Sequence, residues 1–178
     1  MNGDKPLLAG KWEINFGKVL IPAQLLGDIT PNYEEGTLEV ETQAGTRKQP
    51  TGKATSAELT FTMYITELEQ LKTLYNLAGT DPMVFGGGAC MKNNEGAVVH
   101  VHRVCDGKDA KNDIHIYKGI VTTKFNPSLS TKDALSIEGT IQMQPTDNGY
   151  MLLGYPDPKT PQYWDATAQA WKAKPTQA

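Results

Sequence analysis

The sequence predicts a mainly β fold, an antiparallel β-sandwich or half-barrel with one flanking α-helix. Apolar and polar residues alternate with a period of two in several short segments, which is typical of half-buried strands. The chain has 17 glycines and 11 prolines in 178 residues, a frequency that favours short strands and many turns. We expect a single domain over residues 1–178, with an N-terminal arm at 1–10, a β core at 11–155 and a Pro/Trp-containing C-terminal extension at 156–178.

The first half of the chain contains four strand-like segments. In the clearest of them, Glu58–Ile65, every second residue is apolar. The other three are Trp12–Phe16, Val19–Ile21 and Thr37–Thr42. The intervening residues Asp28–Asn32 are of the types that form turns.

A long polar segment, Gln43–Thr55, separates two of these strands. It lacks apolar periodicity and is rich in Thr, Gly, Lys and Gln. The segment predicts a long inter-strand loop, and loops of this length inside a domain usually have a function. A simple hairpin tip is the alternative.

One segment, at about residues 67–78, has the signals of an α-helix. Thr66 and Glu69 fit a capping box, in which two side chains satisfy free amides at the helix start. Leucines, Tyr75 and Ala78 then recur at helical spacing, and Gly79 marks the end.

The second half of the chain is again β-like. Strands are expected at Ala97–Cys105, Asp113–Phe125, Leu135–Gln144 and Tyr150–Tyr155. The extension that follows contains Trp164 and Trp171, which share a face if that segment is helical. These tryptophans are candidates for an arm that reaches a neighbouring subunit, and docking on their own domain is the equal alternative.

Charge and composition exclude several classes of protein. The formal net charge is −3, so the chain is not built to bind nucleic acid by neutralising phosphates. No apolar run is long enough for a membrane span, and we see no signal peptide. Cys90 and Cys105 are expected to stay reduced, in a protein made in a cytoplasm.

Motifs for catalysis are scarce. His100 and His102 share a strand face, and with Asp106 they resemble the first motif of cupin barrels, but the second motif is absent. Gly45–Lys53 is not a P-loop, and no Gly-x-Ser-x-Gly elbow occurs. We therefore expect no enzyme, no cofactor and no bound metal. Two alternatives remain open: a metal-dependent, cupin-like enzyme or sensor that uses His100 and His102, and a monomeric β-sandwich binding module with an aromatic patch around Tyr150–Tyr155.

The polar faces of the predicted strands carry carboxylates, hydroxyls and amides, without lysine or arginine. Their members include Glu39, Glu41, Glu58, Thr60, Thr62 and Glu138. Basic residues are concentrated in the predicted loop instead, at Arg47, Lys48 and Lys53. Such faces suit a surface that must not adhere to a polyanion, because they offer no cation to its phosphates.

The order of polar loop, alternating strand and immediate helix resembles the tail tube proteins of long-tailed bacteriophages. Two stretches carry the resemblance, TGKATSAELTFTMYITELEQLKTL at 51–74 and IYKGIVTTKFNPSLSTKDALSIEGTIQM at 116–143. It covers roughly residues 37–80 and 113–145. The arm, the glycine triplet at 86–88 and the extension have no counterpart that we can align.

The resemblance implies a structural protein of the virion tail, made in the host bacterial cytoplasm, with no membrane partner. Its subunits would assemble into rings, commonly hexameric, that stack into a hollow tube through which the genome passes without specific binding. Tape measure, terminator and distal tail proteins are the implied partners. The loop candidates for ring stacking are Arg47, Lys48, Gln49 and Lys53, and the candidates for the lumen wall are the polar strand residues named above. A tail terminator, a baseplate hub and a secretion-tube subunit remain close variants.

Overall fold

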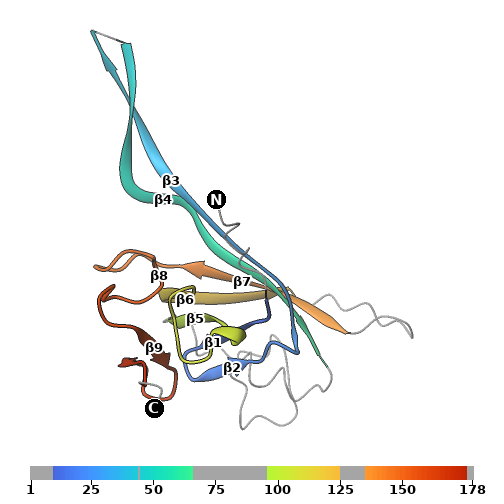
Figure 1. Cartoon of the computed structure of the whole chain (residues 1–178). Coiled ribbons are helices and arrows are strands. Elements are labelled where there is room, and N and C mark those ends of the chain that lie inside the picture. The colour runs from blue at the N-terminus through green and yellow to red at the C-terminus, as the bar shows by residue number, and fades with distance from the viewer. Residues whose placement is uncertain (1–9, 44, 66–95, 125–134, 176–178) are drawn as a thin grey trace, which may run out of the picture.

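The computed structural model describes residues 10–43, 45–65, 96–124 and 135–175 (Figure 1). The helix predicted at 67–78, the glycine triplet at 86–88 and most of the predicted arm lie outside the described residues. None of the helices in the described ranges has both the length and the apolar character that crossing a membrane requires.

The main structural unit is an antiparallel sheet of eight strands, which confirms the predicted mainly β class. Seven strands follow the order β2-β1-β5-β6-β7-β4-β3, and β8 pairs with β6. Within the described ranges this sheet stays open, with β2 and β3 at its two edges. Its strands are β1 (Trp12–Phe16), β2 (Val19–Ile21), β3 (Leu26–Thr42), β4 (Gly45–Tyr64), β5 (Ala97–Arg103), β6 (Ile114–Lys124), β7 (Ser136–Met143) and β8 (Met151–Leu153).

The apolar residues of the alternating strands form one core on one face of the sheet. Its fully buried members include Ile14, Leu59, Val99, Val101, Ile116, Ile137 and Ile141. Phe61 of β4 lies opposite Gly139 of β7, where a Cβ atom would stand only 2.3 Å from the ring. Glycine at this position therefore gives the Phe61 ring its place in the core.

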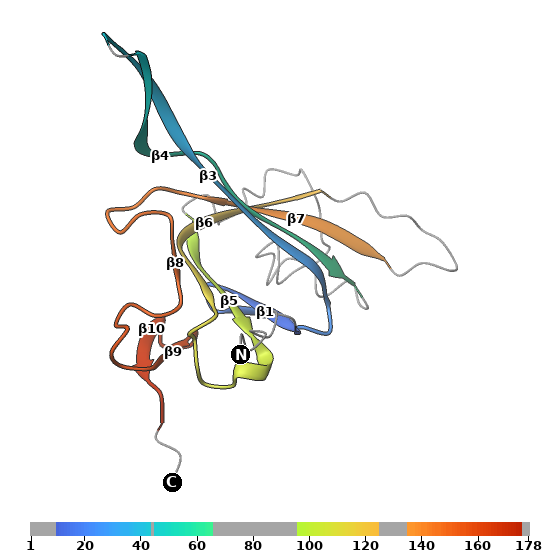
Figure 2. The ribbon, with the colours of Figure 1, turned by 45° about the horizontal axis from the view of Figure 1, so that its top comes forward.

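The predicted long loop is wrong, because most of Gln43–Thr55 belongs to strand β4. β3 and β4 form a long hairpin that turns between Thr42 and Gly45 and projects beyond the other strands (Figures 1 and 2). Only Glu58–Tyr64 of β4 also pairs with β7, so the outer part of the hairpin is a two-stranded ribbon. A ribbon with solvent on both faces needs no apolar period, which is why the pattern resembled a loop. The predicted turn at 28–32 is likewise part of β3, whose Pro31 is tolerated on an edge strand.

The C-terminal extension forms a second, two-stranded sheet of β9 (Gln162–Asp165) and β10 (Ala170–Ala173). It is a hairpin rather than an extended arm or a helix. Trp164 and Trp171 are direct cross-strand partners, with ring centroids 5.5 Å apart. Both rings also contact His100 and His115 of the main sheet, so the tryptophans dock on their own domain.

Candidate functional site

A continuous polar face lies on the side of the sheet opposite the core. Its centre is a row of four threonines, each opposite the next on the neighbouring strand: Thr30 of β3, Thr60 of β4, Thr140 of β7 and Thr122 of β6. Two of their hydroxyls donate back to carbonyl oxygens of the row, from Thr60 to Thr30 and from Thr122 to Thr140. The alternation of β4 and β7 creates this face, because every second residue there is apolar and buried.

Carboxylates and amides flank the threonine row on both sides. Glu58 lies opposite Gln142, whose side-chain amide donates to the Glu58 carboxylate at 3.1 Å. On the other side Thr62 lies opposite Glu138, which is paired through its backbone with Lys124 at the end of β6. Among the residues of β3, β4 and β7 that flank the threonine row in the described part of the sheet, none is a lysine or an arginine. These residues therefore make the surface hydroxylated and weakly acidic, with Lys124 of β6 at its margin.

The outer hairpin separates the predicted site residues onto its two faces. Glu39 and Glu41 lie opposite Lys48 and Thr46, and the Lys48 ammonium is 3.3 Å from the Glu39 carboxylate. On the alternate positions, Leu38 and Val40 lie opposite Gln49 and Arg47. Leu38 is 58% exposed. The structure thus groups Glu39 and Glu41 with Lys48 in the hairpin, at a distance along β3 and β4 from Glu58, Thr60 and Thr62.

The hairpin bends where its register shifts. Glu35 of β3 pairs with Ala54 of β4, but Thr37, two residues further on, pairs with Pro50. The β4 strand therefore has extra residues between these two pairs. The extra residues of β4 fold around Gly36, where a Cβ atom would meet the Lys53 carbonyl oxygen at 2.8 Å. The Thr51 hydroxyl donates to the Gly36 carbonyl at 2.9 Å and holds the bulge. Lys53, the fourth loop candidate, lies at this bend.

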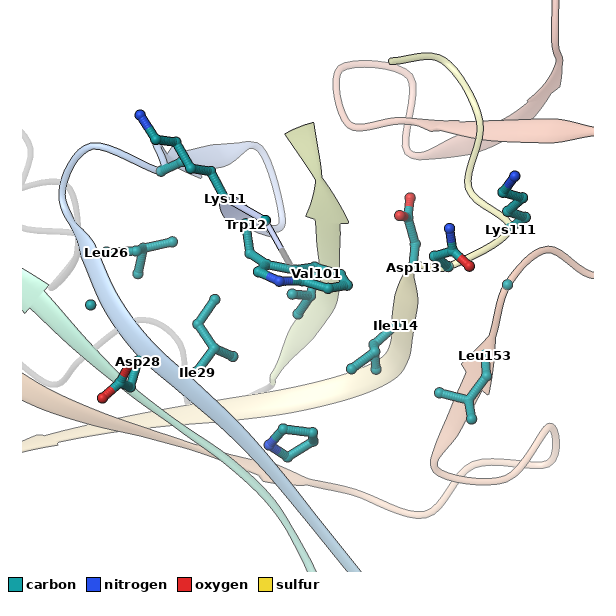
Figure 3. A pocket seen from close by; sticks show the side chains of 16 residues that line it. Lys11, Trp12, Leu26, Asp28, Ile29, Val101, Lys111, Asp113, Ile114 and Leu153 are labelled. Carbon is teal, nitrogen blue, oxygen red and sulfur yellow. The ribbon is translucent and has the colours of Figure 1, made fainter. Parts of the chain in front are cut away.

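A hollow of about 720 Å³ with a mixed lining of apolar and charged residues lies on the core side of the sheet (Figure 3). Trp12, Ile29, Val101, Ile114 and Leu153 supply its apolar lining. Asp113 lines this hollow and also a smaller cavity, of about 180 Å³, beside His100 and His102. The carboxylate therefore stands between the apolar side of the sheet and its histidine side.

The histidines predicted as metal candidates form a buried cluster with a different acid from the expected one. Asp113 Oδ2 lies 2.9 Å from His100 Nε2 and 2.7 Å from His102 Nδ1. His115, opposite His100 on β6, places its Nδ1 3.3 Å from His100 Nδ1. Asp106 is engaged elsewhere, because it accepts two hydrogen bonds from the Arg103 guanidinium and one from Asn112.

The spacing of the sequence did not reveal the role of Asp113. His100 and His102 share a strand face, as predicted, but the acid comes from the residue that precedes β6. β5 and β6 are antiparallel neighbours, so this residue returns to the level of His102. The amide of the next residue, Arg103, donates to Asp113 Oδ1. The sequence does contain one signal for Asp113: an acidic residue stands at the start of the strand that follows the histidine pair.

Burial and neighbours shift the pKa values of this cluster in opposite directions. Burial lowers the pKa of His115 to about 4, and repulsion from His100 acts in the same direction. Burial also disfavours the His102 cation, but the hydrogen bond and charge of Asp113 outweigh it and raise the His102 pKa. Burial disfavours the Asp113 carboxylate, yet the hydrogen bonds from His100 and His102 outweigh it, and the pKa of Asp113 is lowered.

Comparison with known proteins gives matches in structure and none in sequence. No protein-family model matches the chain, and no curated protein matches it significantly. Among solved structures, it is similar to a chain of the sheath/tube terminator of an extracellular contractile injection system, PVC, in the extended state. There the TM-score is 0.54 at 17% identity, over 84% of this chain and 98% of that one. The fold is shared with contractile-injection-system proteins.

Two further solved structures share this fold. A chain of the PVC sheath-tube complex in the extended state matches with a TM-score of 0.52 and 14% identity, over 84% of this chain and 93% of that one. A chain of the anti-feeding prophage cap, which terminates the tube, matches with a TM-score of 0.54 and 12% identity, over 79% and 89%. The shared part therefore spans most of each of these chains.

Proposed function

We propose that the chain is a structural subunit that self-assembles into stacked rings, most simply hexameric, to form the hollow tail tube of a phage-like particle. The observation that carries this proposal is the polar face built around Thr30, Thr60, Thr140 and Thr122. Its role is to line the channel through which the genome passes. The similarity in fold to chains from tube-terminator, sheath-tube and cap structures supports a place in a tail.

The chemistry of that face suits a channel for DNA. Hydroxyls and amides hydrate well, and the carboxylates Glu58 and Glu138 repel phosphates. The described rows of β3, β4 and β7 bring no cation to this face, so they release no counterions from DNA and do not retain it. Lys124 of β6, opposite Glu138, is a basic residue at the margin of the face. Glu39 and Glu41, also expected at the lumen, fit this role less directly, because Lys48 lies opposite Glu39 and forms an ion pair with it.

The hairpin and the sheet edges supply surfaces for assembly. A two-stranded ribbon is marginally stable alone, and the exposed Leu38 gains burial if a neighbouring subunit covers it. Arg47, Lys48, Gln49 and Lys53 then contact the next ring, as the resemblance to tail tube proteins implies. The open edges β2 and β3 pair with adjacent subunits, which protects them from uncontrolled aggregation.

The rest of the chain fits this role as a single domain, with no catalytic task. Its partners in the virion are further copies of itself and the tape measure, terminator and distal tail proteins. Trp164 and Trp171 hold the extension on its own domain, which is the alternative to an arm that reaches a neighbouring subunit.

A tube terminator or cap is the second candidate function, favoured by two of the structural matches. Negative-stain electron microscopy of the purified protein at high concentration separates the possibilities. Long tubes support the tube subunit, and isolated rings that do not stack support the terminator or cap. Monomers that persist at high concentration and are absent from particles contradict both.

A further inference from the structure

The cluster of His100, His102 and Asp113 has the donor set of a metal site. His100 Nε2, His102 Nδ1 and an Asp113 carboxylate oxygen all lie within 4.8 Å of one another. His100 is 2% exposed and Asp113 is 1% exposed, so two of the three donors are shielded from bulk water. Two imidazoles and one carboxylate are the ligands that divalent transition metals, Zn²⁺ in particular, prefer in proteins.

The hydrogen-bond pattern shows how the cluster accommodates a metal. Without one, His100 Nε2 and His102 Nδ1 both donate to Asp113, because a carboxylate only accepts. A metal requires a lone pair on each of these nitrogens. His100 supplies it by moving its proton to Nδ1, where His115 Nδ1 is 3.3 Å away and accepts when its own proton is on Nε2. His115 thereby serves as the outer partner that orients a metal-binding imidazole.

The carboxylate has a comparable support. Asp113 Oδ1 accepts a hydrogen bond from the Arg103 amide at 3.3 Å, which leaves Oδ2 directed at the histidines. The neighbouring cavity of about 180 Å³ is lined by Glu13, His100, His102, Asp113 and Trp164. It offers room for a fourth ligand, and Glu13 lies directly opposite His102 on β1.

We propose that His100 Nε2, His102 Nδ1 and Asp113 form a binding site for one divalent transition-metal ion, Zn²⁺ or a chemically similar ion. The fourth position faces the cavity and is filled by water or by the Glu13 carboxylate. The ion joins β5 to the start of β6 beneath the β9–β10 hairpin, whose Trp164 ring lies 5.9 Å from that of His100. Its role is structural, and it does not depend on the proposed function.

The test uses untagged full-length protein, treated with EDTA and then dialysed against a small excess of Zn²⁺. Metal analysis is expected to give about one equivalent per chain. The thermal midpoint is expected to rise by roughly 5 °C or more at a free Zn²⁺ concentration about 100-fold above Kd. The variant His102→Gln, whose site is partly exposed, is expected to lose the bound ion and the shift. Cys105→Ser is the matched control, because it removes an exposed thiol that is close to His102 in the sequence but is not a proposed ligand, and it should retain both.

Three results overturn the proposal. They are less than half an equivalent in the wild-type protein, retention of the ion by His102→Gln, and loss of the ion by Cys105→Ser. If His102→Gln does not fold, X-ray absorption at the zinc edge of the wild-type protein decides instead. Two imidazoles with oxygen ligands support the site, and a sulfur ligand contradicts it.

Discussion

Thr60 of β4 lies directly opposite Thr140 of β7, and each has another threonine as its partner on the far side. The row crosses four neighbouring strands, and its flanks carry carboxylates and amides. Such a face is polar without being adhesive to DNA, which is the property that a channel for a polyanion requires. The proposed function therefore predicts that a lysine introduced into this row makes the channel bind DNA.

The change Thr60→Lys should convert the proposed channel into a DNA-binding surface. Thr60 is exposed, so the effect on the free energy of unfolding should stay below about 1 kcal/mol. Assembled tubes of the variant should retain short DNA in a salt-dependent and nuclease-protected form, and wild-type tubes should not. Thr160→Lys, at an exposed site away from the face, is the control. Nuclease-protected DNA in the control tubes as well would count against the assignment of the face.

Charge reversal in the outer hairpin should impair assembly without unfolding the subunit. Lys48 and Glu39 form an exposed ion pair, and such pairs contribute about 0.5 kcal/mol or less. The double variant Arg47→Glu, Lys48→Glu should thus keep the thermal midpoint of the monomer but raise the concentration at which light scattering detects assembly. Lys159→Glu, an exposed lysine outside the hairpin, should leave that concentration unchanged. If both changes raise this concentration equally, the hairpin is not part of the assembly interface.

The contact between Phe61 and Gly139 predicts a large effect of a small substitution. Gly139→Ala places a methyl group about where the Phe61 ring lies and should lower the free energy of unfolding by about 1–3 kcal/mol. Phe61→Leu in the same chain should recover part of this loss, with a coupling energy of at least about 0.5 kcal/mol. Chemical denaturation of the four proteins measures the cycle. Purely additive losses would show that the two residues are not in the contact described.

The ion pair of Asp106 with Arg103 should make the free energy of unfolding depend on pH. The Arg103 hydrogen bond lowers the pKa of Asp106, so the folded state binds a proton less readily than the unfolded chain. The stabilisation is therefore present above the unfolded pKa, near 3.9, and is lost as the pH falls through the lower folded value. Asp106→Asn should lower the free energy of unfolding by about 1 kcal/mol at pH 7, and this difference should shrink towards pH 3. A difference that is constant with pH would contradict the ion pair.

Sequence patterns predicted the parts of this structure where burial alternates. Leu59, Phe61 and Met63 revealed β4 because one face of the strand is buried and the other is not. The outer hairpin was missed because both faces of Gly45–Lys53 are exposed, and exposure leaves no period. Backbone pairing, not side-chain burial, makes that segment a strand.

The candidate sites were predictable to a similar degree. Thr60, Thr62, Glu58 and Glu138 were identified from alternation within single strands, but the threonine row depends on the register between strands, which no single strand encodes. His100 and His102 were paired correctly on β5, and Asp113 was missed because its approach depends on the antiparallel return of the chain. The cross-strand contact of Trp164 and Trp171 depends on a turn that the helical interpretation did not include.

An image reconstruction of the assembled protein tests the central claim most directly. The account predicts a hollow tube or ring in which Thr30, Thr60, Thr140 and Thr122 face the channel and the β3–β4 hairpin contacts a neighbouring subunit. A reconstruction with this threonine row on the outer surface would contradict the account, as would a protein that remains monomeric at every concentration examined.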